Sequence, residues 1–124
     1  EDLVEFTIPG SGQRIDPGQY VVLCADGVDP VVPCQGPIYS NGQPCDVNIC
    51  FNNAGDYLEL YDDHSTLVDR VAYDATWPFA SGASMSLTDH CLDNAAAENW
   101  CEETTIYGGA GNNKGTPGGL PSCS

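Results

Sequence analysis

Seven cysteines are the side chains of this sequence with the most chemistry open to them. They stand at Cys24, Cys34, Cys45, Cys50, Cys91, Cys101 and Cys123. No pair has the C-x-x-C spacing that is typical of structural zinc sites, so zinc is disfavoured. Seven thiols in a chain of 124 residues instead indicate disulfides formed in an oxidising compartment. We therefore expect an extracellular or cell-surface protein.

An odd number of cysteines has a consequence of its own. At least one sulfur must be free, capped or bonded to another chain. A free buried thiol and an intermolecular bridge both stay open. The sequence does not determine which cysteines pair, so all seven are disulfide candidates.

Aspartates in two turn-like segments are candidate ligands for calcium. Asp26 and Asp29 lie close together in one segment, and Asp62 and Asp63 are adjacent in the other. Hard cations bind several oxygens from a bent loop, and each pair could supply two. Neither segment matches the twelve-residue calcium loop, and diffuse attraction of counterions to an acidic surface accounts for the same residues. We expect no required cofactor, with calcium as the one candidate.

Hydrolytic chemistry has little support. His64 lies in a predicted turn, and neither it nor His90 belongs to a G-x-S-x-G segment or another nucleophile setting. The acid pairs Asp62-Asp63 and Glu102-Glu103 could suggest a glycosidase, but both adjoin turn residues and are interpreted as solvated surface charge. We predict that the protein is not an enzyme.

Composition and charge set further limits. The length of 124 residues and the 41% hydrophobic content predict one domain, residues 1–124, with one core. Trp77 and Trp100 could form a sugar-binding platform, but packing in that core is favoured.

Eighteen acidic residues against three basic ones give a net charge of −15, which excludes nucleic-acid binding through phosphates. No apolar run is long enough for a membrane span, so we expect no membrane insertion.

Short alternating segments separated by turn residues predict an all-β sandwich or barrel. The expected strands are Val4–Ile8, Gln19–Cys24, Tyr57–Tyr61, Leu67–Tyr73 and Met85–Leu87. Alternation in Tyr57–Tyr61 predicts that Leu58 and Leu60 point inward and Glu59 outward. The segment Asp93–Glu98 is at most one helical turn. The Gly-rich tail from Gly108 requires a contact that holds it to the rest of the chain, and Cys123 is the obvious residue to form it.

Several segments follow one another in a recognisable order: Asp16–Leu23, Asn53–Asp62, Leu67–Tyr73, Trp77-Pro78, Gly82–Leu87, Asn99-Trp100 and Gly115–Gly118. Together, and in this order, they resemble the lamin-tail domain family, as found in secreted bacterial proteins. The resemblance implies an immunoglobulin-like β-sandwich with no catalytic site of its own. It also implies that Cys101 and Cys123 are the best candidates for a disulfide.

Two departures from the family pattern bear on function. We expect the strands that usually precede this region to be missing, either because that segment was removed or because a neighbouring chain supplies it. A Cys/Pro-rich insertion occupies about residues 25–50, with Cys34 to Cys50 inside it. A sandwich without edge strands exposes backbone groups that invite another strand. We therefore expect a structural or adhesive module that self-associates, in filaments or a surface layer, with a protein partner supplying the strand. The alternative is a surface- or substrate-binding module from a larger secreted hydrolase.

Overall fold

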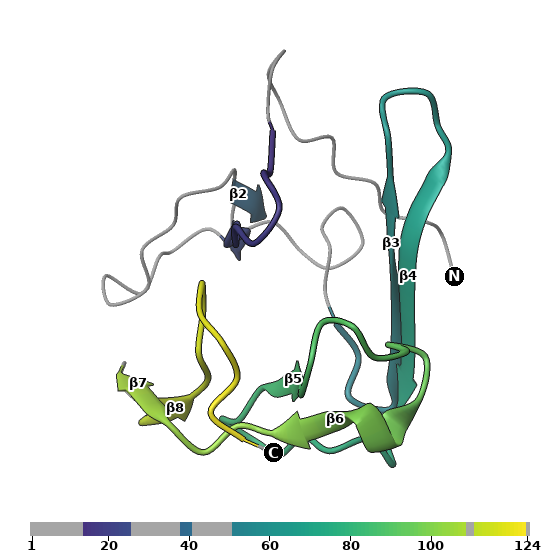
Figure 1. The fold of residues 1–124 in the computed structure, drawn as a ribbon. Helices are drawn as coiled ribbons and strands as arrows, with labels where there is room; N and C mark the ends of the chain where they lie inside the picture. Colours follow the sequence, from purple (N-terminus) through teal and green to yellow (C-terminus); the bar gives the residue numbers. More distant parts are fainter. Residues whose placement is uncertain (1–13, 26–37, 41–50, 109–110, 124) are drawn as a thin grey trace.

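The computed structural model describes residues 14–25, 38–40, 51–108 and 111–123, and across these ranges the chain is all-β (Figure 1). The strands are β1 (Cys24–Ala25), β2 (Ile38–Ser40), β3 (Gly55–Tyr61), β4 (Leu67–Asp74), β5 (Met85–Leu87), β6 (Trp100–Glu102), β7 (Ile106–Gly108) and β8 (Asn113–Lys114). One 3₁₀ turn, η1 (Ala97–Asn99), precedes β6. The expected all-β class is confirmed. The predicted strand Val4–Ile8 and most of the Cys/Pro-rich insertion lie outside the described residues.

Each described strand pairs with one partner. The pairs β3–β4, β5–β6 and β7–β8 are antiparallel, and β1–β2 is parallel. In Figure 1, β5 to β8 and the C-terminal tail lie together as a base, and β3 and β4 stand upright from one end of it. We call these two parts the base and the ribbon.

Backbone hydrogen bonds join the two halves of the base through the segment before β5. The amide of Lys114 donates to the carbonyl of Gly82 (2.8 Å), and the amide of Ser84 donates to the carbonyl of Lys114 (3.1 Å). The amide of Glu103 in turn donates to the carbonyl of Ser84 (2.9 Å). The segment 82–84 therefore links β8 on one side to the end of β6 on the other.

The ribbon confirms the expected hairpin. Its strands are slightly longer than expected at the end away from the turn, where β3 begins at Gly55 and β4 ends at Asp74. Its turn is built by Asp62, whose carboxylate accepts from the amides of His64 (2.9 Å) and Thr66 (2.8 Å). Aspartate suits this position because its short side chain can accept hydrogen bonds from nearby backbone amides. Ser65 adopts a left-handed φ of 61° and returns the chain into β4.

One expected strand is wrong over most of its length. The turn at Asp16–Gly18 forms, with the amide of Gln19 donating to the carbonyl of Asp16 (3.0 Å), but β1 begins only at Cys24. Residues 19–23 have no strand partner among the described residues, and Val21 and Leu23 are about two-fifths exposed (40% and 41%). β-branched side chains favour a strand only where a neighbouring strand supplies the ladder. The expected helical turn near Asp93–Glu98 is found slightly later, at η1.

The core of the described region lies in the base around the two tryptophans. Trp77 is 9% exposed, and its ring lies 5.7 Å from that of Trp100, centroid to centroid. The indole nitrogen of Trp100 donates to the carbonyl of Asn94 (3.0 Å). Core packing is therefore confirmed for Trp77, and Trp100 is half-buried with its ring tilted by 49° against that of Trp77.

The start of the ribbon gives a first prediction. Gly55 has a φ of +136°, and a Cβ there would lie 3.0 Å from the carbonyl oxygen of Tyr73. We expect Gly55→Ala to lower the free energy of unfolding by about 1–3 kcal/mol, measured by urea denaturation. Gly119→Ala is the matched control, because its nearest contact is at 3.7 Å. Equal stability of the two variants would contradict the positive φ and the close backbone approach at Gly55.

Candidate functional site

The β3–β4 ribbon has the most exposed apolar surface of the described elements. Leu58, Leu60 and Val68 are 47%, 48% and 59% exposed. In the described part of the chain no third strand pairs with either edge of the ribbon. The expectation that Leu58 and Leu60 point into a core is therefore wrong here, because no second layer lies over their face among these residues. Glu59, expected outward, has a side chain that is only 20% exposed.

The opposite face of the ribbon is polar and aromatic. Glu59 faces Arg70 across the strands, with 3.6 Å between a carboxylate oxygen and Nε. The Arg70 guanidinium lies 4.9 Å from the centre of the Tyr57 ring, and the Tyr61 hydroxyl donates to Glu59 (2.8 Å). That hydrogen bond raises the pKa of Tyr61 above its ordinary value. These mutual contacts explain why Glu59 is covered, and they give the two faces different chemistry.

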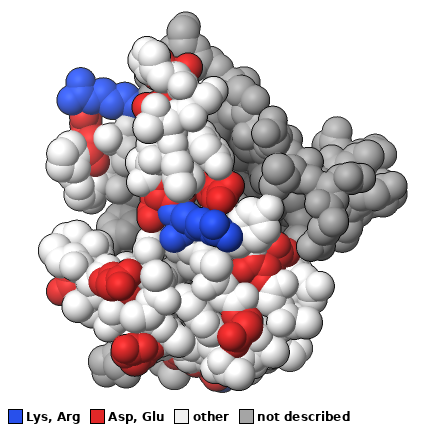
Figure 2. All heavy atoms as spheres, turned by 90° about the vertical axis from the view of Figure 1, so that its right-hand side faces the viewer, with Lys and Arg blue, Asp and Glu red and all other residues white. Residues whose placement is uncertain are grey.

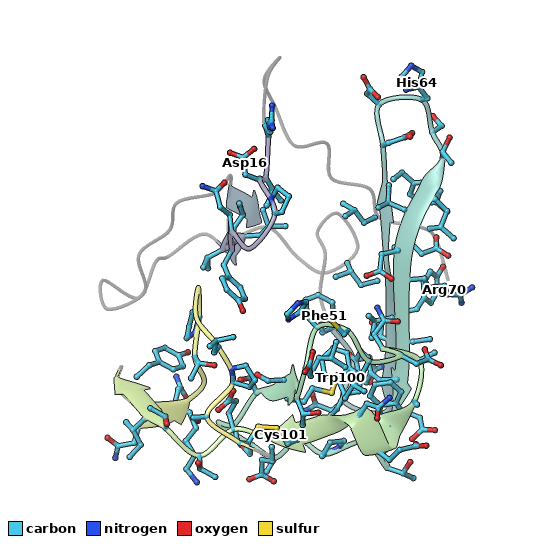
Figure 3. All side chains as sticks on the ribbon, in the orientation of Figure 1. Asp16, Phe51, His64, Arg70, Trp100 and Cys101 are labelled. Atoms are coloured by element: carbon cyan, nitrogen blue, oxygen red, sulfur yellow. A yellow bond between two sulfur atoms is a disulfide. The ribbon has the colours of Figure 1, made fainter. Side chains whose placement is uncertain are left out.

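Arg70 projects from the side of the ribbon that faces away from the rest of the molecule (Figure 3). The face seen in Figure 2 carries several Asp and Glu side chains around few cationic ones, as expected for a chain with a net charge of −15. This surface therefore repels a second copy of the chain at low ionic strength.

Side-chain contacts hold the lower part of the ribbon to its surroundings. The amide nitrogen of Asn94 donates to both carboxylate oxygens of Asp69 (2.9 and 3.0 Å). The hydroxyl of Tyr73 donates to the carbonyl of Asn52 (3.0 Å), and the Tyr73 ring meets Phe79 edge-on at 5.8 Å. Burial raises the pKa of Tyr73. The ribbon is thus anchored at its lower end, and its tip extends away from the base (Figure 1).

The tip brings the predicted calcium ligands Asp62 and Asp63 together with His64. Their ligand atoms lie within 4.8 Å of one another, and all three residues are exposed. Asp62 already accepts two backbone amides, and Asp63 pairs with the His64 ring nitrogen at 2.7 Å. The other predicted ligands, Asp26 and Asp29, lie outside the described residues. Calcium therefore stays a prediction.

A second exposed group contains Asp89, His90 and Cys91. The amide of Cys91 donates to the Asp89 carboxylate (2.8 Å), which lowers the pKa of Asp89. The His90 ring lies 3.7 Å from the same carboxylate, and its side chain is 84% exposed. Both histidines of the chain are thus solvent-exposed beside an aspartate, which is not the sheltered setting that a nucleophile and base require.

The cysteines divide into two groups. The structure brings the sulfur atoms of Cys101 and Cys123 together, with Cα atoms 5.8 Å apart, a separation in the usual range for a disulfide (Figure 3). Cys91 is exposed and has no disulfide partner among the described residues. The side chains of Cys24, Cys34, Cys45 and Cys50 lie outside the described residues.

Glu103 is the residue that sequence reasoning missed. The acid pair Glu102-Glu103 was expected on the surface, and this is wrong for Glu103, which is 0% exposed. Its carboxylate accepts from the Thr116 hydroxyl (2.9 Å), the Ser122 amide (3.2 and 3.3 Å) and the Ser122 hydroxyl. The alternation of β6 could have indicated this burial. Continued one residue past the strand, it places position 103 on the same face as buried Cys101.

Two opposing effects set the acidity of Glu103. Burial raises its pKa because it disfavours the charged form, but hydrogen bonds from Ser122, Ser86 and Thr116 together outweigh burial, so the pKa is lowered overall. The carboxylate is therefore ionised in the fold and draws the tail segment 116–122 onto the base.

No family model, curated protein or solved structure matches this chain.

The Glu103 contacts give a second prediction. All three partners donate, so Glu103→Gln places an amide donor against donors in a buried site. We expect this change to lower the free energy of unfolding by about 1–3 kcal/mol in a urea titration at neutral pH. Glu102→Gln, at the exposed neighbouring position, should stay within about 0.5 kcal/mol of the parent.

The same pair of variants tests the pH dependence. Because the pKa of Glu103 is lower in the fold than its ordinary value of 4.5, its contribution is complete above that value and is lost as the pH falls through the folded pKa. Below about pH 5, Glu102→Gln should therefore lose stability more steeply than Glu103→Gln. Parallel pH profiles for the two variants would contradict a stabilising Glu103 carboxylate.

Proposed function

We propose that this chain is a non-catalytic, extracellular structural or adhesive module that self-associates by adding a strand from a neighbouring copy to its β3–β4 ribbon. The observation that carries this proposal is the ribbon itself, which has no third strand and exposes Leu58, Leu60 and Val68 in the described region. Unpaired strand edges invite pairing with another chain, and a bare two-stranded hairpin is marginally stable in water. A further strand would supply the hydrogen bonds, and its side chains would cover part of the apolar face beside it.

The proposed fold is an immunoglobulin-like sandwich of the lamin-tail type. Local structure supports it: the hairpin, the Asp16–Gly18 turn and the turn at Thr116–Gly119 all form at segments of the resemblance. In a sandwich the aliphatic face of the ribbon packs against a second sheet. We infer that a neighbouring copy contributes to this layer. The resemblance and the shape of the ribbon thus lead to the same proposed interface.

Charge would regulate such an assembly. Copies with a net charge of −15 repel each other, and this repulsion weakens as salt shortens its range to about 8 Å at physiological ionic strength. The apolar part of the contact is independent of that screening. Association should therefore strengthen with salt, in contrast to an assembly held by ion pairs.

Lysine substitutions separate the ribbon contact from net charge. Leu58→Lys on the ribbon and Leu120→Lys in the tail change the net charge equally, and both leucines are well exposed (47% and 70%). We expect the parent and Leu120→Lys to form larger species as salt and concentration rise, and Leu58→Lys to stay monomeric in analytical ultracentrifugation. Hydrogen exchange in β3 and β4 should slow in the parent assembly, as strand addition requires.

Two results would overturn this proposal. One is a parent protein that stays monomeric at high concentration and high salt. The other is association of Leu58→Lys that equals that of Leu120→Lys, because net charge and not the ribbon contact would then determine association.

A disulfide between Cys101 and Cys123 is part of the proposal, because it fits secretion and ties the tail to β6. Their Cα separation of 5.8 Å supports it. A non-reducing peptide map of the secreted protein should yield these two cysteines in one linked peptide. The double variant Cys101→Ser/Cys123→Ser should lose about 2–5 kcal/mol of stability, the usual effect of removing a native disulfide from a small secreted domain. Free thiols at both positions in the secreted protein would rule the bridge out.

A further inference from the structure

A hollow of about 480 Å³ lies in the base, on surfaces that the proposed assembly does not use. The segment before β5 contributes Gly82 to Ser84, β5 contributes Ser86, and β7 contributes Tyr107. The remaining wall is formed by residues 113–117, which comprise β8 and the turn after it. Sites for small molecules commonly measure about 300–1,000 Å³, so this hollow can hold a ligand of one or two sugar rings.

One lining hydroxyl is oriented by the buried carboxylate. The Thr116 hydroxyl donates its proton to a carboxylate oxygen of Glu103 (2.9 Å). A hydroxyl has one proton and two lone pairs, so an oxygen that donates to a carboxylate keeps acceptor capacity for another group. Thr116 therefore presents an acceptor to the hollow, and the Ser86 hydroxyl in the same lining can accept as well, which suits a ligand with hydroxyl donors.

Lys114 adds a positive charge to the lining. Of the three basic residues, Arg14 is paired with Asp16 at 2.5 Å and Arg70 with Glu59 at 3.6 Å. Lys114 has no carboxylate within 4.0 Å among the described residues, although the chain carries eighteen acidic residues. Lys114 is half-buried as a residue, and a lysine without an acidic partner among the described residues favours a ligand that brings its own carboxylate.

Tyr107 gives the lining an aromatic surface beside a glycine. A Cβ at Gly115 would lie 2.9 Å from the Ser84 hydroxyl oxygen and 3.3 Å from a Tyr107 ring atom, so glycine keeps this wall open. An aromatic ring with a polar hydroxyl can cover the C–H face of a sugar ring and still hydrogen-bond at its edge. Asn113 adds an amide that can donate and accept.

We propose that this hollow binds a carboxylated saccharide residue of the uronic-acid class. The sugar hydroxyls donate to Ser86 and Thr116, the carboxylate pairs with Lys114, and Tyr107 packs against the ring. A site of this kind would let the module attach to an acidic polysaccharide, and it does not depend on strand addition at the ribbon.

The test uses the full chain with oligosaccharides of galacturonic and glucuronic acid, titrated against ¹⁵N-labelled protein. The neutral galactose and glucose oligomers serve as the comparison. We expect amide shifts at residues 82–86, 107 and 113–116 with the acidic sugars, and weaker binding as salt rises. Lys114→Gln should weaken binding about tenfold, because it removes a charge-assisted hydrogen bond to the carboxylate of the sugar.

Arg70→Gln is the matched control, because it removes the same charge from the ribbon and should leave saccharide binding unchanged. Saturable shifts at these residues that depend on Lys114 support the proposal. Absence of shifts at tens of millimolar acidic sugar would overturn it, as would equal affinity for neutral sugars. Equal binding of acetate or a polyglutamate peptide would also overturn it, because the site would then recognise a carboxylate without a sugar.

Discussion

The base of this protein depends on one buried charge that has no cationic partner among the described residues. Glu103 lies fully out of solvent, and its carboxylate is stabilised by hydroxyl and amide donors from the tail. A buried charge without such donors is costly enough to unfold a small domain or to shift its own protonation. The tail from Thr116 to Ser122 is therefore held in position by the need to satisfy Glu103, with Cys101 and Cys123 brought together beside it.

This arrangement contrasts with the ribbon. In the base, polar contacts converge on one residue, and the ordered strands are only two or three residues long. In the ribbon the strands are seven and eight residues long, yet most of their side chains are exposed. Long strands that bury little contribute little stability of their own, because the hydrophobic effect scales with the area removed from water. The part of the molecule with the most regular backbone thus has the most to gain from a partner.

Sequence reasoning succeeded where local chemistry decides the structure. The alternation of Tyr57–Tyr61, the turn at Asp62 and the short strand Met85–Leu87 each carry their own signal within a few residues. It failed where a distant segment decides. Among the described residues, Gln19 to Leu23 lack a strand partner and Leu58 and Leu60 lack a covering layer. The tail residues that donate to Glu103 lie 13 and 19 positions further along the chain. The exposed ribbon and the hollow around Lys114 likewise depend on where segments far apart in the chain lie, which no local pattern encodes.

The scarcity of basic residues has a consequence for proteolysis. Trypsin-like proteases cut after arginine or lysine and need several residues around the cut in an extended, unpaired form. Here Arg70 lies within β4, Lys114 lies within β8, and Arg14 is tied to Asp16. Two of the three possible cleavage points are thus already engaged in a backbone ladder, which exposed loops are not. Of the three basic residues only Arg14 lies outside a strand pair, so the fold leaves this class of protease one cleavage point that is not held in a ladder.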